Sequence, residues 1–300
     1  MNGIEMIDPG TTIRASFVIV NYNRKDELLI TITKTKDISK TAAGTFEIVV
    51  VDNASNDGSA EAVKAYHPDV VLIENKVNTG APGWNLGFEK ANGAYFIILD
   101  DDSHMESGLE DALEFLDVNP DVGVVACNIK GGMFGTSDWE DLGDTIGFIG
   151  CGAFFRKKVY DEIGGYADWI FLYNNEWDLG MRVLQAGYKL KYFAKCHVTH
   201  RASPLNRTTK RLKVFSIRNE MAVVYKYYNK DQRNLYLFRV YMNNLKEIKR
   251  LGLSSIPWFY EALKEFFKLI KTLPYTPVSK ELERMYTKKY WPARPFLGLI

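Results

Sequence analysis

Three consecutive aspartates, Asp100, Asp101 and Asp102, follow the apolar run Tyr95–Leu99. Adjacent carboxylates repel one another, so such a cluster at the end of a strand costs stability unless a cation neutralises it. Carboxylate oxygens suit hard divalent ions such as Mg²⁺ and Mn²⁺, which complete their shell with water and substrate phosphates. The triplet therefore indicates a metal site that holds a diphosphate and stabilises the charge it gains as a leaving group. The alternative for the triplet alone is an acidic, solvated turn.

A second acidic pair, Glu176 and Asp178, lies at the start of a predicted helix that Asn174 or Asn175 can cap. Asp178 and Arg182 are four residues apart and can pair on the helix surface. A carboxylate at a helix N-terminus stays ionised easily, and a general base must be ionised. Glu176 is therefore a candidate base. The alternative is that it is only a favourable first-turn charge.

The elements that must position these residues alternate along the first hundred residues. Nearly continuous apolar runs predict four strands that are buried on both faces of a parallel sheet: Ala15–Val20, Phe46–Val51, Val70–Glu74 and Tyr95–Leu99. Three segments between them are long enough for crossover helices: Asp26–Ile38, Ser59–His67 and Pro82–Ala91. This order predicts an open α/β domain.

A polar residue follows each predicted strand: Asn21, Asp52, Asn75 and Asp100. Open parallel sheets bind ligands in the crevice beyond the carboxyl ends of their strands, so these four side chains should gather along one edge. One aspartate after a strand usually forms a turn or caps a helix. Four polar positions in succession favour a binding site instead.

Several motifs occur in a fixed order around these strand ends: Val18–Asn23 (VIVNYN), Val50–Ser59 (VVDNASNDGS), Asn78–Gly80 (NTG), Trp84–Gly87 (WNLG) and the acidic triplet. Taken together they resemble the inverting family 2 glycosyltransferases of the GT-A fold, and most closely the rhamnosyltransferase-like branch. The resemblance spans residues 14–202. It implies a Rossmann-like, mostly parallel sheet flanked by helices and a nucleotide-sugar donor, with a UDP- or dTDP-sugar favoured.

The resemblance also implies roles for individual residues at the donor site. The positions that would line the nucleotide pocket or shape the loop beside it are Asn21, Tyr22, Asn23, Asp52, Asn78, Gly80, Asn85 and Asp100. Asp52 would hydrogen-bond the base, and Asp100 would lie near the ribose. Asp102 would bind the Mn²⁺ or Mg²⁺ ion that bridges the donor diphosphate. Asp101, in the variable middle position of the DxD signature, would point elsewhere.

In the family, the segment that supplies the base commonly reads Glu-Asp-x-Asp, and its second acidic residue is the base. Here Asn175 takes the first acidic position and Glu176 the second. The departure keeps a carboxylate at the base position, so activity is still expected, with Asp178 as the fallback base.

The resemblance extends to the metal and the acceptor side. His200, which ends the strand-like run Leu190–Thr199, would reach the metal or the diphosphate. Gly150, Gly152 and Trp177 would form the acceptor side, where the glycines would let a sugar approach the backbone. His67, His104 and His197 are interpreted as structural.

The last hundred residues differ from the rest in charge and in pattern. They hold 21 Lys and Arg against 7 Asp and Glu, a net charge of +14, so the first 200 residues carry −13 of the overall +1. Three helices are predicted there: Val214–Tyr228, Asn234–Leu251 and Ser254–Leu273. The last has an apolar side and a lysine side, so it either covers the sheet or lies on an anionic membrane surface. The charge asymmetry likewise indicates either a basic segment that faces an anionic surface or two halves that neutralise each other.

Composition limits the class of protein. The three cysteines lack CxxC spacing and lie in apolar stretches, which predicts buried thiols in a reducing compartment. The N-terminus lacks the basic-then-apolar design of a signal peptide, and no apolar run approaches the roughly 20 residues of a bilayer span. A cytoplasmic protein is therefore expected, possible attachment being to the inner face of the membrane. The basic region has no recognisable nucleic-acid motif, so no nucleic-acid partner is expected.

These observations predict a catalytic domain over residues 12–205 and a basic helical region over 206–300. Residues 12–102 would form the nucleotide-binding half and 103–205 the acceptor half. The predicted reaction is an in-line, inverting transfer of one sugar to a glycan or lipid-linked acceptor, in polysaccharide or glycan assembly. The QxxRW motif of processive synthases is absent. One alternative is a sugar-phosphate nucleotidyltransferase, although the first strand lacks the glycine-rich loop that normally follows it there. The other alternative is a catalytically silent nucleotide-sugar-binding module.

Overall fold

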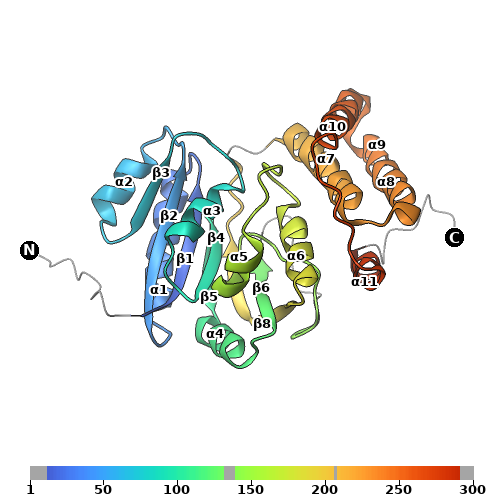
Figure 1. The fold of residues 1–300 in the computed structure, drawn as a ribbon. Helices are drawn as coiled ribbons and strands as arrows, with labels where there is room; N and C mark the ends of the chain where they lie inside the picture. The colour runs from blue at the N-terminus through green and yellow to red at the C-terminus, as the bar shows by residue number, and fades with distance from the viewer. Residues whose placement is uncertain (1–11, 132–138, 206–207, 291–300) are drawn as a thin grey trace, which may run out of the picture.

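The computed structural model describes residues 12–131, 139–205 and 208–290, and the strands in these ranges form one eight-stranded sheet (Figure 1). In chain order they are β1 (Ile13–Asn21), β2 (Thr45–Asn53), β3 (Val71–Asn75), β4 (Tyr95–Asp100), β5 (Ser103–Ser107), β6 (Val122–Lys130), β7 (Ala153–Arg156) and β8 (Lys189–His200). Their order across the sheet is β3-β2-β1-β4-β7-β6-β8-β5. The pairs among β3, β2, β1 and β4 are parallel, β7 is antiparallel to both of its neighbours, and β6 and β8 are parallel. The predicted α/β, mostly parallel sheet is confirmed.

The four predicted strands are present and lie next to one another. The central residues of β1, β2 and β4, such as Val18, Val50 and Ile97, are fully buried, because helices cover both faces of the sheet. The edge strand β3 is the exception: its residues are half-buried or exposed, so the prediction that it is buried on both faces is wrong. The strands end close to where the apolar runs end, with Asn21, Asn53, Asn75 and Asp100 as their last residues. Parallel neighbours end at the same edge, so these polar ends meet there as predicted.

Helices cover the two faces of the sheet in two sets of three. One face is covered by α1 (Lys25–Ser39), α2 (Ser59–Tyr66) and α4 (Leu109–Val118), whose apolar side chains share one core with the sheet. The other face is covered by α3 (Gly83–Lys90), α5 (Lys157–Ile163) and α6 (Asn175–Gln185), which build a second core. The three predicted crossover helices correspond to α1, α2 and α3.

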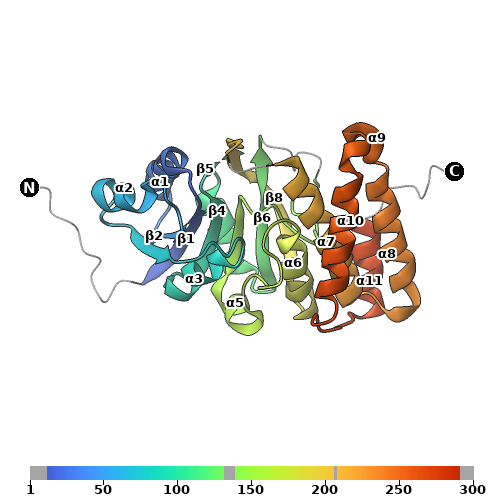
Figure 2. The same cartoon turned by 90° about the horizontal axis from the view of Figure 1, so that it is seen from above.

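The C-terminal helices form a bundle at the end of the molecule opposite β2 and β3 (Figure 2). They are α7 (Thr209–Tyr227), α8 (Lys230–Leu245), α9 (Ile248–Leu251), the 3-10 turn η1 (Leu253–Ser255), α10 (Ile256–Leu269) and α11 (Lys280–Tyr290). The prediction of a single helix over Asn234–Leu251 is wrong, because α8 ends at Leu245 and α9 is a separate turn. Helix α11 was not predicted.

Helix α10 does not cover the sheet, so that sequence-based alternative is wrong. Its buried residues Phe259, Ala262 and Phe266 pack in a third core that belongs mainly to the C-terminal bundle. Ile146 and Met181 of the sheet-containing part also lie in this core. The basic region is thus packed onto α6, the helix that carries Glu176.

Cys127, Cys151 and Cys196 are buried free thiols, as predicted. None of the helices within the described ranges combines the length and the apolar composition that a bilayer span requires.

Candidate active site

The ends of β1 and β2 carry a buried amide–carboxylate pair. Asn21 and Asp52 face each other in the strand register, and Asn21 Nδ2 donates to Asp52 Oδ1 at 2.9 Å and to Ser55 Oγ at 3.0 Å. The other carboxylate oxygen of Asp52 accepts from the Ser55 backbone N–H at 3.1 Å. This network fixes the orientation of both side chains before any ligand binds.

The residues after β1 continue the same network. Asn23 is in the left-handed region (φ 52°), its backbone N–H donates to Ser55 Oγ at 2.9 Å, and its Oδ1 accepts from the Asn56 backbone N–H at 2.8 Å. The backbone N–H of Tyr22 donates to Asp101 Oδ2 at 3.2 Å. The predicted nucleotide residues Asn21, Tyr22 and Asn23 therefore line one edge of the sheet together with the acidic triplet.

The loop after β3 is organised by Asn53, a buried residue that sequence reasoning missed. Its Nδ2 donates to Asn78 Oδ1 at 3.1 Å and to the Gly80 carbonyl at 3.2 Å, and its Oδ1 accepts from Asn75 Nδ2 at 3.0 Å. Gly80 has φ +69°, and a Cβ there would lie 2.0 Å from the carbonyl oxygen of Phe171. Only glycine fits this approach, which joins the nucleotide loop to the segment that leads into α6.

The acidic triplet is held by Arg24, a second residue that sequence reasoning missed. Arg24 Nη1 lies 2.8 Å from Asp101 Oδ1 and 3.3 Å from Asp102 Oδ2. Asp102 Oδ2 also accepts from the Ser203 backbone N–H at 2.8 Å. Asp101 thus pairs with Arg24, which also contacts Asp102, and its role at the middle position of the signature stays a prediction.

The three carboxylates leave an excess of negative charge at this edge. Burial raises the pKa of Asp101 to about 7; Arg24 opposes this shift, and the carboxylates of Asp102 and Asp100 add to it. A cation near Asp100 and Asp102 would relieve the repulsion, as the sequence suggested.

His200, at the end of β8, lies beside this cluster. Its Nε2 is 3.1 Å from Asp102 Oδ1 and 3.9 Å from Asp100 Oδ2. Ligand atoms of Asp100, His200 and Cys151 lie within 4.8 Å of one another, so the group could hold a metal ion. The carboxylate of Asp100 and the imidazole of His200 fit a Mn²⁺ or Mg²⁺ ion that also binds phosphate oxygens. The buried thiol of Cys151 is the exception, since its pKa is raised well above its ordinary value by burial, and a thiol that stays protonated is a poor ligand. Asp102, the ligand that the sequence predicted, is not in this group, although its Oδ1 lies 3.1 Å from His200 Nε2.

Glu176 stands in the first turn of α6, after two residues with strained backbones. Tyr173 (φ 68°) and Asn174 (φ 59°) are both left-handed, an uncommon conformation for residues other than glycine. Asn174 is the helix N-cap, although its side chain makes no capping hydrogen bond. This turn places the carboxylate of Glu176 against the backbone of Gly150. A Cβ added at Gly150 would lie 2.3 Å from Glu176 Oε1. Because Gly150 has no side chain, the carboxylate of Glu176 can approach it and accept a hydrogen bond from its backbone N–H.

The environment of Glu176 favours its protonated form more than water does. Burial raises its pKa to about 7, the nearby carboxylate of Asp100 adds to the rise, and the hydrogen bonds from the backbone of residues 176 and 150 oppose it. Glu176 and Asp100 come from opposite halves of the chain, and the fold brings them close enough to interact. A carboxylate whose pKa lies near neutral pH is suited to accept a proton.

Asp178, the fallback base, is fully buried and occupied on both oxygens. Arg182 Nε lies 2.9 Å from Oδ2, while Lys226 Nζ and the Tyr227 hydroxyl lie 3.1 and 2.7 Å from Oδ1. Lys226 and Tyr227 belong to α7, so Asp178 ties α6 to the C-terminal bundle. The geometry favours Glu176 over Asp178 as the base.

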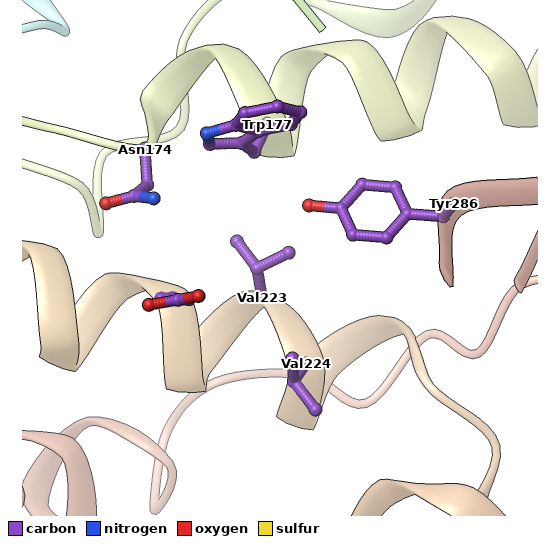
Figure 3. A pocket seen from close by; sticks show the side chains of 6 residues that line it. Asn174, Trp177, Val223, Val224 and Tyr286 are labelled. Carbon is purple, nitrogen blue, oxygen red and sulfur yellow. The ribbon is translucent and has the colours of Figure 1, made fainter. Parts of the chain in front are cut away.

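Trp177 lies on the side of α6 that faces the bundle. Figure 3 shows it in a small pocket with Asn174, Val223, Val224 and Tyr286, and its ring contacts that of Tyr286 edge-on at 6.1 Å between centroids. The ring also packs against Gly147, where a Cβ would lie 2.9 Å from Trp177 Cε3. The sequence grouped Trp177 with Gly150 and Gly152 on the acceptor side, and that role stays a prediction.

Two other predicted residues have packing or scaffolding contacts. Asn85 Nδ2 donates to the Tyr166 carbonyl at 2.8 Å, and its Oδ1 accepts from the Tyr166 backbone N–H at 2.8 Å, so Asn85 holds the loop at Tyr166. A Cβ at Gly152 would lie 2.7 Å from Ile129 and 3.0 Å from Val198 side-chain carbons. Gly152 therefore permits close packing in the core.

Arg201 is a third residue that sequence reasoning missed. Its guanidinium contacts Glu27 Oε2, the Thr31 hydroxyl at 2.7 Å and the Asp101 carbonyl at 3.2 Å, and it lies 2.8 Å from His104 Nδ1. His104 is buried in this cluster, as expected of a structural histidine. Arg24 and Arg201 directly follow the motifs at Asn21–Asn23 and His200, and this adjacency was the only sequence signal for them.

The chain is similar to known proteins in sequence and in fold. The family model described as "Glycosyl transferase family 2" matches residues 16–178, more than half of the chain. This chain belongs to glycosyl transferase family 2. The matched range contains the sheet edge, the acidic triplet, Glu176 and Asp178.

Curated relatives fit the same assignment. An uncharacterised glycosyltransferase, YwdF of Bacillus subtilis, is 28% identical over 53% of this chain and 66% of its own length. The O-antigen chain rhamnosyltransferase WbaN of Salmonella anatum is 24% identical over 51% of this chain and 56% of its own length. The matches thus span about half to two thirds of these relatives. A named rhamnosyltransferase among them agrees with the predicted branch.

Solved structures agree on the fold. The mannosyltransferase PcManGT of Pyrobaculum calidifontis, solved with GDP-Man and Mn²⁺, has a TM-score of 0.57 over 96% of this chain and 83% of its own, at 18% identity. The similarity supports the GT-A fold that the sequence predicted.

Proposed function

We propose that this protein is a non-processive, inverting glycosyltransferase that moves a sugar from a nucleoside-diphosphate sugar to an acceptor hydroxyl. The observation that carries the proposal is the approach of Glu176 to Asp100, which joins a candidate base to the end of the nucleotide-binding strands. Family membership supports the same class of reaction.

The donor half of the proposed site consists of residues that are already fixed in place. Asp52 and Asn21 hold each other and are 4% and 0% exposed, so they fix the shape of the sheet edge and need not reorganise when a nucleoside binds there. Asn53 fixes the loop of Asn78 and Gly80 beside it. We assign the nucleoside of the donor to this edge of the sheet, and favour uracil or thymine as its base.

The diphosphate would lie at the acidic triplet. Asp102, His200 and Asp100 would hold a Mn²⁺ or Mg²⁺ ion, which when bound neutralises the diphosphate of the leaving group. Arg24 holds Asp101 and Asp102 from the opposite side, so the carboxylates keep their orientation whether or not a ligand is present. The solved relative with GDP-Man and Mn²⁺ supports a metal of this kind.

The transfer is a single displacement. The acceptor oxygen attacks the anomeric carbon as the bond from that carbon to the diphosphate oxygen breaks, and Glu176 takes the hydroxyl proton. The electron pair of the broken bond leaves with the nucleoside diphosphate. Because no enzyme nucleophile takes part, the configuration at the anomeric carbon inverts.

The acceptor is proposed to be a glycan or a lipid-linked glycan of cell-surface polysaccharide assembly. An O-antigen rhamnosyltransferase among the relatives supports this class. Gly150, whose missing side chain lets the Glu176 carboxylate reach its backbone N–H, is the residue we place next to the acceptor hydroxyl.

Thermal unfolding in the presence of nucleotide sugars tests the proposal. A donor that binds only the folded protein stabilises it by about 2.7 kcal/mol at a concentration a hundredfold above its Kd. The melting temperature should therefore rise with a UDP- or dTDP-sugar and Mn²⁺ together, and less with either alone. The matched variant is Asp102→Asn, which should lose most of the Mn²⁺-dependent part. A wild-type protein that no nucleotide sugar stabilises would contradict the donor assignment.

Product analysis then separates the enzyme from a silent binding module or a nucleotidyltransferase. A glycosyltransferase that has bound its donor with Mn²⁺ transfers the sugar to an acceptor, or slowly to water, and releases the nucleoside diphosphate. A nucleotidyltransferase running in reverse would consume pyrophosphate and release a nucleoside triphosphate. Binding without release of nucleotide would leave only the silent module.

A further inference from the structure

Large apolar side chains are exposed along one side of η1 and α10. Leu253, Ile256, Tyr260 and Phe267 are 78%, 48%, 71% and 56% exposed. We call these four residues the α10 face. It lies on the C-terminal bundle, at the end of the molecule away from β2 and β3 (Figure 2).

The α10 face is a second apolar stripe on a helix that already has one. At 100° per residue, Ile256, Tyr260 and Phe267 lie within about 40° of one another around the helix, and the buried Phe259, Ala262 and Phe266 are centred about 100° away. The buried stripe packs in the core of the bundle with α7. A surface helix needs only one such stripe to hold it on its domain, so the second stripe is not explained by folding.

Cations border the α10 face. Lys264, Lys268 and Lys271 are exposed and follow the face along the helix and just beyond its end. Their acidic neighbour Glu261 is engaged by Lys210 of α7 at 2.9 Å. Aromatic and aliphatic side chains beside lysines are the pattern of helices that lie in the interface of an anionic bilayer.

Cations also lie near Leu253, the N-terminal end of the α10 face. Leu253 follows α9, where Lys249 and Arg250 are exposed, Arg250 being ion-paired with Glu247 at 2.8 Å. The last hundred residues together carry a net charge of +14. A second copy of this chain docked symmetrically on the same face would bring these charges together, whereas an anionic surface would attract them.

We propose that the α10 face binds an anionic lipid bilayer, with Leu253, Ile256, Tyr260 and Phe267 in the headgroup region and the lysines on lipid phosphates. This gives a specific site to the membrane attachment that the sequence left open. It does not depend on the glycosyl-transfer proposal. The face would hold the catalytic domain near acceptors that are themselves lipid-linked.

Co-sedimentation of the full-length protein with vesicles tests the proposal. Wild-type protein should sediment with vesicles of phosphatidylcholine that contain phosphatidylglycerol, and at least about tenfold less with phosphatidylcholine alone. The double variant Tyr260→Ser/Phe267→Ser should lose about tenfold of its partitioning into the anionic vesicles. The matched control, Tyr66→Ser/Val118→Ser, removes two exposed apolar side chains from α2 and α4 and should bind as the wild type does.

The charge part of the proposal has its own variant. Lys264→Gln/Lys268→Gln/Lys271→Gln should also weaken binding to anionic vesicles, and the salt dependence of its remaining binding should be smaller than that of the wild type. Melting temperatures of all variants should match the wild type, because the altered side chains are exposed.

Several results would overturn the inference. They are a wild-type protein that stays in the supernatant with anionic vesicles, an apolar double variant that sediments as the wild type does, and binding that neutral vesicles support equally. A concentration-dependent dimer that Tyr260→Ser/Phe267→Ser abolishes would show that the face binds another copy instead. The donor-dependent thermal shift, measured on the same variants, reports separately on the proposed function.

Discussion

The two halves of the candidate site surround their carboxylates in opposite ways. At the sheet edge, Asp102 is fully buried and its Oδ2 accepts from Arg24 and from the Ser203 backbone N–H. On α6, Glu176 is only half-buried, its hydrogen bonds include one from the Gly150 backbone N–H, and its charged neighbour is Asp100, which repels it. The first environment fixes the orientation of a carboxylate, while the second lets a carboxylate change its protonation state.

The difference also holds within α6 itself. Glu176 and Asp178 are two residues apart, yet Asp178 is enclosed by Arg182, Lys226 and Tyr227. Position on the helix decides this, because Glu176 faces the glycine at 150 while Asp178 faces α7. Proximity in sequence therefore says little about which of the two can exchange a proton. Substituting each carboxylate in turn tests the two roles.

The largest effect is expected from Glu176→Gln. The amide keeps the size of the side chain but cannot accept the acceptor proton, so kcat should fall about a thousandfold, which corresponds to about 4 kcal/mol of barrier. Binding of the donor with Mn²⁺ should change little, because Glu176 is not part of the nucleotide edge. Steady-state kinetics and donor titration measure the two quantities. A kcat within tenfold of the wild type would remove Glu176 from the base role.

Asp178→Asn should act on stability instead of on chemistry. Removing the charge leaves Lys226 and Arg182 beside a neutral amide in a buried setting, and breaking a buried ion pair in this way costs about 3 kcal/mol. Chemical denaturation should show this loss, while kcat of the folded protein stays within about tenfold of the wild type. The double variant Asp178→Asn/Lys226→Met should recover part of the stability. A large loss of kcat at unchanged stability would instead return Asp178 to the role of base.

The regular part of the site could be predicted because buried parallel strands leave a strong trace in the sequence. The runs that became β1 to β4 are apolar on both faces, and the polar residue after each run marks the sheet edge. From this pattern Asn21, Asp52 and Asp100 could be placed together. Glu176 came from a family resemblance and from its place in a first helical turn.

The remaining features depend on tertiary contacts that no local pattern encodes. Arg24 lies 77 residues from Asp101 in sequence, and nothing near either residue shows that they pair. The apolar stripe of α10 predicted that the helix packs on something, but not that the partner is α7 instead of the sheet. The resemblance gave Trp177 an acceptor-side role, but no local pattern predicted its contact with the ring of Tyr286.

The smallest expected effect is the pH dependence that the raised pKa of Glu176 produces. Glu176 must be ionised to accept a proton, so kcat should rise with pH and level off above about 7, falling about tenfold for each pH unit below that value. Asp101 has a pKa raised to about 7 as well, but it pairs with Arg24 and takes no proton from the acceptor. Asp101→Asn should therefore keep the acidic limb of the profile. In Glu176→Gln, the residual rate should lose that limb, because the group that titrates is gone. If the limb were retained in Glu176→Gln and lost in Asp101→Asn, the two halves of the site would have exchanged the roles assigned to them.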